Sequence, residues 1–311
     1  MRIYSESLEF VSQVVDADPA WAEVDNSDCR LIPERLLKSI LKSGSIYETS
    51  VQREGLFGSM LITEESDESQ YDIAVDLQKS NVEIPHGTLC LAGSGARFHG
   101  QRDRSWSSPP GNIYLTVVFV PKKEIDHFGP GFVILPAVSV LDTIDSIEGL
   151  EGRASLKWVN DILIDKAKVA GVLTYSQAMG KDVTGVVLGI GLNVETTPDV
   201  ELTHFVRDVA CLSDYVDDYR LCNRRLVLEK LLHHLEKNYR ILEGGGYFKL
   251  LDKYGTRSAI VGKKVTICSD DGDAEEKVIA RGIVREIGEN LELYLQGQAK
   301  PVSRGRLVLE T

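Results

Sequence analysis

The chain has 311 residues, of which 43% are hydrophobic and 26% charged, a composition that can bury a core and argues against disorder. The formal net charge of −12 argues against a general binder of nucleic acid or of anionic membranes, because both need a basic protein surface. Five scattered cysteines, without a CxxC or Cys/His pattern, favour a reduced cytoplasmic protein over a disulfide framework or a metal site. The N-terminus lacks the apolar segment of a signal peptide, and no apolar run reaches the roughly 18 residues that predict a membrane span.

Residues 1–55 carry the weakest patterns. Apolar spacing predicts one helix over residues 31–43, ended by Gly44, and nothing basic follows it that would enter a DNA groove. We interpret this part as an N-terminal extension packed on the main domain.

Residues 56–258 alternate between strand-like and helix-like segments. Strands are predicted over residues 58–63, 88–92, 113–120, 156–164, 169–175 and 184–194. Helices are predicted over residues 70–80, with Ser69 as the N-cap, and over 132–146, 223–242 and 247–254.

Residues 259–311 change to short alternating strands. These are predicted over residues 264–268, 277–286, 291–296 and 306–310, with turns at 270–272 and 288–290. This spacing indicates a small β-barrel at the C-terminus.

The predicted hairpin over residues 156–175 contains polar residues where a core is expected. Lys157, Asn160 and Asp161 lie among apolar neighbours, and burying such groups unpaired would cost several kcal/mol. Lys168 is followed three residues later by Gly171, where the backbone could approach a ligand closely. Two lysines and a glycine directed to one place indicate an anion site, and a half-buried hairpin with solvated lysines is the plain alternative.

A second unusual segment is the arginine loop, residues 93–104, which reads GSGARFHGQRDR. It carries Arg97, Arg102, Arg104 and His99 against one acid, Asp103. If the loop and the hairpin face one cleft, their charges suit a polyanion such as the phosphates of ATP. The chain has no GxxxxGK[ST] phosphate loop, and GIGLN at 189–193 is too short for a dinucleotide fingerprint.

Taken in order, these segments resemble the biotin–protein ligases. That family shows GRGRxGRxW, SPxGxLY, KWPND, KxxGIL and IGxGxNV, followed by a small SH3-like barrel. The corresponding segments here are HGQRDRSW at 99–106, SPPGNIY at 108–114, KWVND at 157–161, KVAGVL at 168–173 and GIGLNV at 189–194.

The resemblance implies an α+β fold. A mixed β-sheet catalytic domain of the class II aminoacyl-tRNA synthetase type, covered by helices on one side, would span residues 56–258. It further implies that ATP, with Mg²⁺, activates biotin as biotinyl-5′-AMP, and that a lysine of a biotin carboxyl carrier protein then receives the biotinyl group. The expected partner is an acetyl-CoA carboxylase-type carrier, with no nucleic acid and no membrane, and the enzyme would be a monomer or homodimer.

The resemblance also assigns roles to residues. The expected catalytic residues are Lys168, Lys157, Arg102 and Asp161. The expected ATP and adenylate contacts are Gly100, Gln101, Arg102, Arg104, Trp106, Asn160 and Asn193. The expected biotin contacts are Ser69, His99, Gly100, Lys168 and Gly171, and no residue is expected to form a metal site.

The arginine loop departs from the family pattern. Phe98 and Asp103 stand where the family has glycines, and Gln101 stands where it has an arginine. The loop would therefore hold the adenylate less tightly, or the acid would differ from biotin, for example lipoate, although no RRxSGGGxVxHD-like segment occurs. A non-catalytic scaffold on the same fold is a third reading, against which the two hairpin lysines argue.

Overall fold

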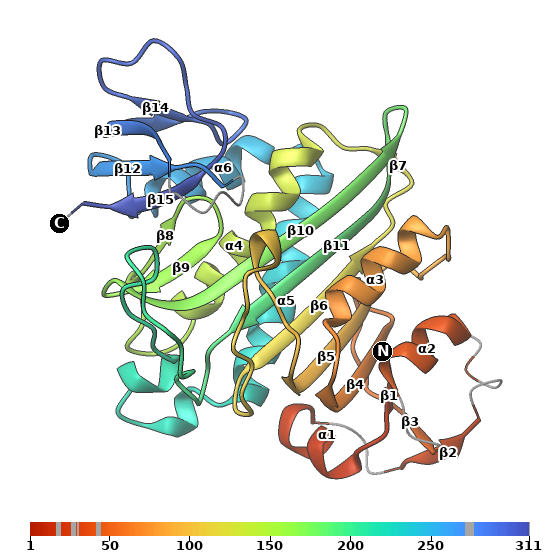
Figure 1. The fold of residues 1–311 in the computed structure, drawn as a ribbon. Helices are drawn as coiled ribbons and strands as arrows, with labels where there is room; N and C mark the ends of the chain where they lie inside the picture. Colours follow the sequence, from red (N-terminus) through yellow and green to blue (C-terminus); the bar gives the residue numbers. More distant parts are fainter. Residues whose placement is uncertain (17–19, 26–28, 30, 42–44, 271–276, 311) are drawn as a thin grey trace.

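The computed structural model describes residues 1–16, 20–25, 29, 31–41, 45–270 and 277–310. Within these residues, one large mixed sheet has the strand order β2-β3-β1-β4-β5-β6-β11-β10-β9-β8, with β7 paired to β11 (Figure 1). The pairs β1–β4 and β4–β5 are parallel. The strands are β1 (Arg2–Ser5), β2 (Ala22–Val24), β3 (Ile46–Ser50), β4 (Ser59–Ser66), β5 (Thr88–Gly95), β6 (Ile113–Phe119), β7 (Lys123–Glu124), β8 (Ala154–Lys157), β9 (Asp161–Ile164), β10 (Ala167–Met179) and β11 (Asp182–Leu192).

Helices cover both faces of this sheet, so the expectation of helices on one side is wrong. They are α1 (Leu8–Val14), α2 (Glu34–Ile40), α3 (Gln70–Lys79), α4 (Phe128–Asp145), α5 (Arg224–Glu243) and α6 (Tyr247–Thr256). Along β11, Val186 and Leu188 point into the core that includes α4 and α5, whereas Val187 points into the core that includes α2 and α3. All residues of β6 are buried, and a strand buried on both sides needs cover on both sides.

The helix α4 is long and apolar enough to cross a membrane by length and composition alone. In this structure 67% of that apolar window is buried, and its side chains pack against the sheet and α5. Such burial is typical of a helix in the core of a folded domain. The start of this helix differs from the prediction. The helix was predicted from residue 132, whereas α4 begins at Phe128, directly after His127, whose backbone has a left-handed conformation.

The predicted strand over residues 156–164 is two strands, β8 and β9, paired with each other across a turn at residues 158–160. Tertiary contacts explain the break. The indole of Trp158 leaves the sheet for the apolar core of the C-terminal barrel, and its Nε1 donates to the carbonyl of Leu291 at 2.7 Å. The hydroxyl of Tyr254 donates to the carbonyl of Val159 at 2.8 Å. The turn is therefore held by groups far away in the sequence.

Three strands in residues 1–50 were not predicted. β1 pairs with β4 in parallel, and β3 and then β2 extend the same sheet beyond β1. These strands are only three to five residues long, too short for a clear alternation in the sequence. The predicted helix over 31–43 corresponds to α2, while residues 42–44, including Gly44, lie outside the described part of the chain.

The C-terminal sheet is antiparallel, with the order β14-β13-β12-β15, and encloses its own apolar core. Its strands are β12 (Lys264–Cys268), β13 (Val278–Ile287), β14 (Leu293–Leu295) and β15 (Arg306–Leu309). They agree with the strands predicted for a small barrel, consistent with an SH3-like domain. Of the turn predicted at 270–272, residues 271 and 272 lie outside the described part.

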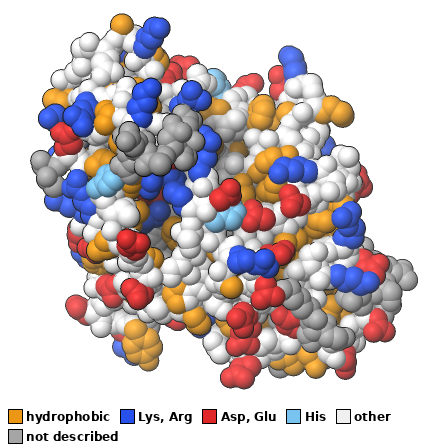
Figure 2. All heavy atoms as spheres, viewed as in Figure 1, with side chains coloured by type: hydrophobic (Ala, Val, Ile, Leu, Met, Phe, Trp, Pro, Cys, Tyr) orange, Lys and Arg blue, Asp and Glu red, His pale blue; other side chains and the backbone are white. Residues whose placement is uncertain are grey.

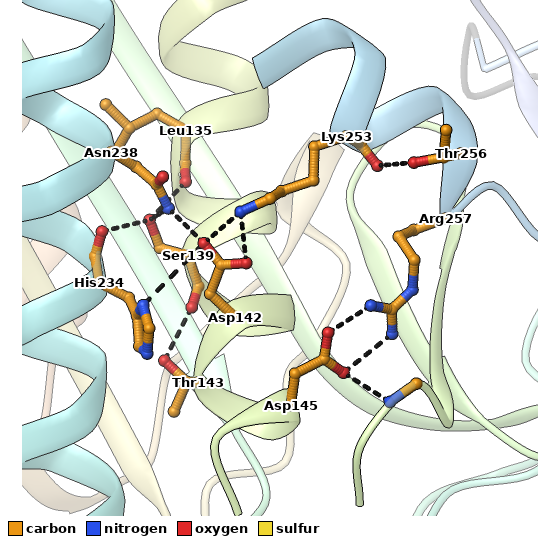
Figure 3. A network of polar contacts seen from close by, with 11 residues as sticks. Leu135, Ser139, Asp142, Thr143, Asp145, His234, Asn238, Lys253, Thr256 and Arg257 are labelled. Atoms are coloured by element: carbon orange, nitrogen blue, oxygen red, sulfur yellow. Dashed lines mark hydrogen bonds and ion pairs between the residues drawn. The ribbon is translucent and has the colours of Figure 1, made fainter. Parts of the chain in front are cut away.

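A polar network joins α4, α5 and α6 on the side of the sheet away from α3 (Figure 3). The ammonium of Lys253 lies 2.7 and 2.8 Å from the two carboxylate oxygens of Asp142. The buried amide of Asn238 donates to Asp142 at 3.0 Å and to the Ser139 hydroxyl at 3.1 Å. Asp142 thus connects α4 with α5 and α6 through its bonds to Asn238 and Lys253.

Next to this network, Arg257 ties the end of α6 to the sheet. Its guanidinium pairs with Asp145 and also donates to the carbonyl of Ala154, the first residue of β8. The backbone on either side of Ser258 pairs with Leu156. The segment that leads into the barrel is therefore fastened to the strand that ends at Lys157.

We expect Asp142→Ala to lower the free energy of unfolding by about 2 kcal/mol, because it leaves a buried amide and a half-buried ammonium without their acceptor. Chemical denaturation would measure the loss. Glu229→Ala, at an exposed site on α5, is the control and should change stability by no more than about 0.5 kcal/mol. Equal stability of the two variants would contradict a structural role of the network.

Candidate active site

A cleft of ≈ 300 Å³ opens on the face of the sheet that also carries α3. Its floor is formed by β10, β11 and β6, and its walls by the arginine loop, the β8–β9 turn, the first turn of α3 and the segment 198–209. Gly305, Arg306 and Leu307 of the barrel also line it. Figure 2 shows basic side chains gathered over the barrel, although the chain as a whole is acidic.

Twelve of the thirteen predicted site residues line this one cleft. They are Ser69, His99, Gly100, Gln101, Arg104, Trp106, Lys157, Asn160, Asp161, Lys168, Gly171 and Asn193. Arg102 does not line it. The loop and the hairpin, which lie more than 50 residues apart in the sequence, are thus brought together as expected.

Lys168 and Asp161 form a close ion pair in the cleft. The Lys168 ammonium lies 2.6 Å from Asp161 Oδ1, and the two side chains are only 18% and 19% exposed. The same ammonium lies 5.0 Å from the centre of the Trp106 ring, a cation–π contact. Lys168 is a half-buried cation whose carboxylate partner an incoming anion could replace.

Lys157 is the more deeply buried cation, at 8% exposure. Its ammonium donates to the carbonyl of Phe205. Burial lowers the pKa of Lys157 below its ordinary value, and the positive charges of Lys168 and Arg306 lower it further, while Asp161 opposes the shift. An anion that binds beside such a desolvated ammonium stabilises its charged form.

Arg306 brings the barrel into the site. Its guanidinium carbon lies 3.5 Å from the centre of the Phe205 ring, whose carbonyl accepts the bond from Lys157. This contact could not be predicted, because the three residues are far apart along the chain and belong to no shared motif.

Trp106 lies flat on the floor of the cleft between Gly171 and Gly191. A Cβ atom at Gly171 would stand 2.9 Å from the indole, and one at Gly191 would stand 2.7 Å from it, so neither position accepts a side chain without displacement. The indole Nε1 is buried and has no hydrogen-bond partner among the described residues. The close approach that Gly171 permits is taken by this indole.

The arginine loop is a tight turn and is anchored at both ends. Gly100 N donates to the Arg104 carbonyl at 2.7 Å, and Trp106 N donates to the Phe98 carbonyl at 2.9 Å. Phe98 packs on Gly95, where a Cβ would meet its ring at 2.3 Å, and forms an edge contact with Tyr114. Phe98 therefore stiffens the start of the loop.

Both arginines at the tip of the loop turn towards the barrel. Arg104 donates to Asp270 at 3.2 Å, and Arg102 Nε lies 3.5 Å from the other oxygen of the same carboxylate. Arg102 is 59% exposed and has φ of 57°, in the left-handed region. Asp270, just after β12, was missed from the sequence because 166 residues separate it from Arg104.

His99 bridges the loop and α3. Its Nε2 lies 2.7 Å from Asp72 Oδ2 and its Nδ1 lies 2.8 Å from the Gly100 carbonyl. Burial lowers the pKa of His99, but the bonds to Gly100 and Asp72 outweigh this effect, and the pKa is raised overall. Because both ring nitrogens face acceptors, the imidazolium form satisfies them together.

Asn160 and Asn193 make contacts within the protein. Asn160 Nδ2 donates to the Val172 carbonyl at 2.6 Å and so fixes the β8–β9 turn to β10. Asn193 Nδ2 donates to the Ala210 carbonyl at 3.0 Å, while its Oδ1 is buried without a partner among the described residues. Asn193 therefore retains an acceptor for a ligand.

The first turn of α3 supplies Ser69 and Gln70. Ser69 is the N-cap residue by backbone position, as predicted, but its side chain makes no capping hydrogen bond. Gln70 is 2% exposed, and neither its amide nitrogen nor its amide oxygen has a hydrogen-bond partner among the residues that the structure describes. Gln70 was not predicted as a site residue, although it stands directly after Ser69.

Among the described residues, no group of three or more His, Cys, Asp or Glu side chains is placed to hold a metal ion. The carboxylates that line the cleft are Asp161 and Glu201. Magnesium is commonly held by one or two carboxylates together with substrate phosphates, so this donor set suits an ion that arrives with a nucleotide.

Residues 83–193 match the Biotin/lipoate A/B protein ligase family. The chain is 30% identical over 210 residues to the Bifunctional ligase/repressor BirA of Bacillus spizizenii, which covers 66% of this chain and 62% of that protein's length. It is 34% identical over 100 residues to the Biotin--[acetyl-CoA-carboxylase] ligase of Paracoccus denitrificans, which covers 32% of this chain and 41% of that protein.

Among solved structures, a Biotin protein ligase from Aquifex aeolicus in complex with biotin and ATP has the same fold. It matches with a TM-score of 0.60 and 21% identity, and the match covers 82% of this chain and 99% of that one. Similarity at this level shows the fold alone, so the function has to be argued from the residues of the cleft.

Proposed function

We propose that the protein is a biotin–protein ligase, because residues 83–193 match the Biotin/lipoate A/B protein ligase family and the chain is similar to a Bifunctional ligase/repressor BirA. It activates biotin with ATP as biotinyl-5′-AMP and transfers the biotinyl group to a lysine of a biotin carboxyl carrier protein. The observation that carries the proposal is the pair of neighbouring cations, buried Lys157 and half-buried Lys168, in a cleft that the arginine loop also lines.

In the first step, an oxygen of the biotin carboxylate attacks the α-phosphorus of ATP, and the bond to pyrophosphate breaks. Two anions must approach each other, so cations have to offset their repulsion. Lys168 leaves Asp161 and binds the reacting carboxylate and the α-phosphate instead. Lys157, which is more deeply buried, stabilises the negative charge of these same two groups. Arg104, which lines the cleft, binds the departing pyrophosphate, and Arg102 joins it when the tip of the loop turns into the cleft. Magnesium would supply further charge when it is bound with ATP.

In the second step, the amine of the carrier lysine attacks the acyl carbon, the amide bond forms and AMP leaves. The incoming lysine must lose a proton before it can attack. Asp161, once Lys168 has turned to the phosphate, is the carboxylate in the cleft that can orient this lysine. Trp106 and Asn193 line the space proposed for the adenine and ribose, and Asn193 Oδ1 offers an acceptor there.

The domains divide this work. Residues 56–258 carry most of the cleft, the described part of residues 259–311 forms the barrel that contains Asp270 and Arg306, and the described strands within residues 1–55 extend the sheet. The proposed partner is an acetyl-CoA carboxylase-type carrier domain, on the pattern of the Paracoccus denitrificans relative's name. A cytoplasmic location suits the five cysteines, all of which are buried.

Release of pyrophosphate from ATP tests the first step. We expect release that requires biotin and magnesium and that continues to one equivalent per enzyme when no carrier is present. Biotin-independent release, or none above background, would contradict the proposal and favour a scaffold on the same fold.

Asp270 lies where a phosphate oxygen would meet the loop arginines, so it competes with ATP for Arg102 and Arg104. We expect Asp270→Asn to lower the KM for ATP about two- to fivefold, the effect of losing one partly exposed ion pair. Steady-state kinetics at several ATP concentrations would measure it. A raised KM would mean that Asp270 supports the loop instead, and Asp252→Asn, an exposed change on α6, serves as the control.

A further inference from the structure

The cleft has two chemically different ends. β11 runs along its floor, with Gly189, Gly191 and Asn193 on the cleft side of the strand. From Gly189 to Asn193 the strand spans about 13 Å. Asn193 lies beside the cationic end, because its N–H donates to the carbonyl of Val169, the neighbour of Lys168.

The other end is largely neutral. Tyr71 of α3 lies over Gly189, where a Cβ atom would stand 3.1 Å from its ring. Thr116 is opposite Gly189 in the β6–β11 pairing, and Phe98 and Tyr114, which form an edge contact, also line the cleft. The charge of His99 there is balanced by Asp72 at 2.7 Å. An acid with its carboxylate near Lys168 would therefore place its other end against uncharged groups.

Gln70 is the polar side chain at this neutral end that lacks partners. It is 2% exposed, it lines the cleft, and both its amide nitrogen and its amide oxygen lack a hydrogen-bond partner in the described structure. Buried polar groups are nearly always hydrogen-bonded, and an amide left without both bonds is costly. A ligand that supplies an acceptor and a donor side by side would satisfy it.

We propose that Gln70 is a specificity-determining residue that recognises the cyclic urea of the acyl substrate. The urea carbonyl accepts from Gln70 Nε2, and a urea N–H donates to Gln70 Oε1. This inference rests on the proposed function, since it assumes that the acid enters with its carboxylate at Lys168. According to this proposal, a residue of α3 determines which carboxylic acid binds, and this residue lies outside both the arginine loop and the hairpin that carries Lys157 and Lys168.

Calorimetric titration of the full chain with three acids would test the assignment. Biotin and dethiobiotin both carry the cyclic urea, whereas octanoate has a carboxylate and an aliphatic chain without it. We expect Gln70→Met to weaken biotin and dethiobiotin about 10- to 100-fold, as when a buried hydrogen-bonding pair is broken. Octanoate binding should change less than about twofold, because it makes no bond to the amide.

Gln78 offers a matched control on the same helix. It is 5% exposed, and its Oε1 also lacks a hydrogen-bond partner within the described part of the chain, but it packs against Gly185 and does not line the cleft. Gln78→Met should leave biotin binding unchanged. If Gln70→Met does not fold, Gln70→Glu replaces the donor by a second acceptor and should also weaken the two urea acids selectively.

Biotin binding by Gln70→Met within twofold of wild type would overturn the inference, as would an equal loss for all three acids, which indicates a structural role. Failure of the proposed function is a separate result. Wild type that binds biotin through Gln70 yet releases no pyrophosphate would refute the ligase activity and keep the assignment of Gln70.

Discussion

Lys168→Ala is expected to reduce biotin-dependent pyrophosphate release about 10²- to 10³-fold, the usual cost of removing one charge-stabilising donor from an active site. Lys168 is the cation in the cleft that can exchange partners, since among the described residues its ammonium pairs with Asp161 at 2.6 Å and lies over the face of Trp106. Without it, the carboxylate and the α-phosphate repel each other, and Asp161 adds a further unpaired negative charge. Release of radiolabelled pyrophosphate under saturating ATP would measure the loss.

A nearby lysine provides the control for this variant. Lys166 lies in the turn between β9 and β10 and is exposed. Lys166→Ala changes the net charge by the same amount and should leave the rate within about twofold of wild type, as is usual for exposed sites. A Lys168→Ala enzyme that adenylates biotin at the wild-type rate would refute the central residue assignment.

Lys157→Met is expected to separate activity from stability. Activity should fall about 10²-fold or more, because the variant lacks a preorganised cation that faces the developing charge. The free energy of unfolding should stay the same or rise at neutral pH, because an apolar side chain of similar length replaces a desolvated ammonium. Paired activity and denaturation measurements would show the two changes.

The lowered pKa of Lys157 also sets a pH dependence. The folded protein releases the proton of Lys157 at a lower pH than the unfolded chain does. Wild-type stability therefore gains a contribution as the pH rises from the folded pKa towards the ordinary lysine value of 10.5. Lys157→Met should lack this contribution, and an unchanged pH profile would argue that the ammonium is not strained in the folded state.

Much of the site could be predicted because its parts are local. Lys157, Asp161 and Lys168 lie on neighbouring strands joined by short turns, so sequence spacing alone places them close together. The glycines at 171 and 191 are directly opposite each other in the next hairpin, β10–β11, whose two strands are joined by a short turn. Strand β6 and helices α5 and α6 were likewise predicted to within a few residues.

The remainder depends on contacts between distant segments. Trp158 breaks the predicted strand because the barrel core, more than 100 residues away, accepts its indole. Asp270 and Arg306 reach the cleft only through the packing of the barrel on the sheet. Gln70 was overlooked for a different reason: an amide at the start of a helix gives no signal until burial shows that it lacks partners.

The most direct test of the account is the intact mass of a biotin carboxyl carrier domain after incubation with the enzyme, ATP, magnesium and biotin. We predict a gain of one biotinyl group, located on a single lysine, which is absent without ATP and absent with Lys168→Ala. A carrier whose mass stays unchanged with the wild-type enzyme, while the same carrier is modified by an established biotin–protein ligase, would contradict the account.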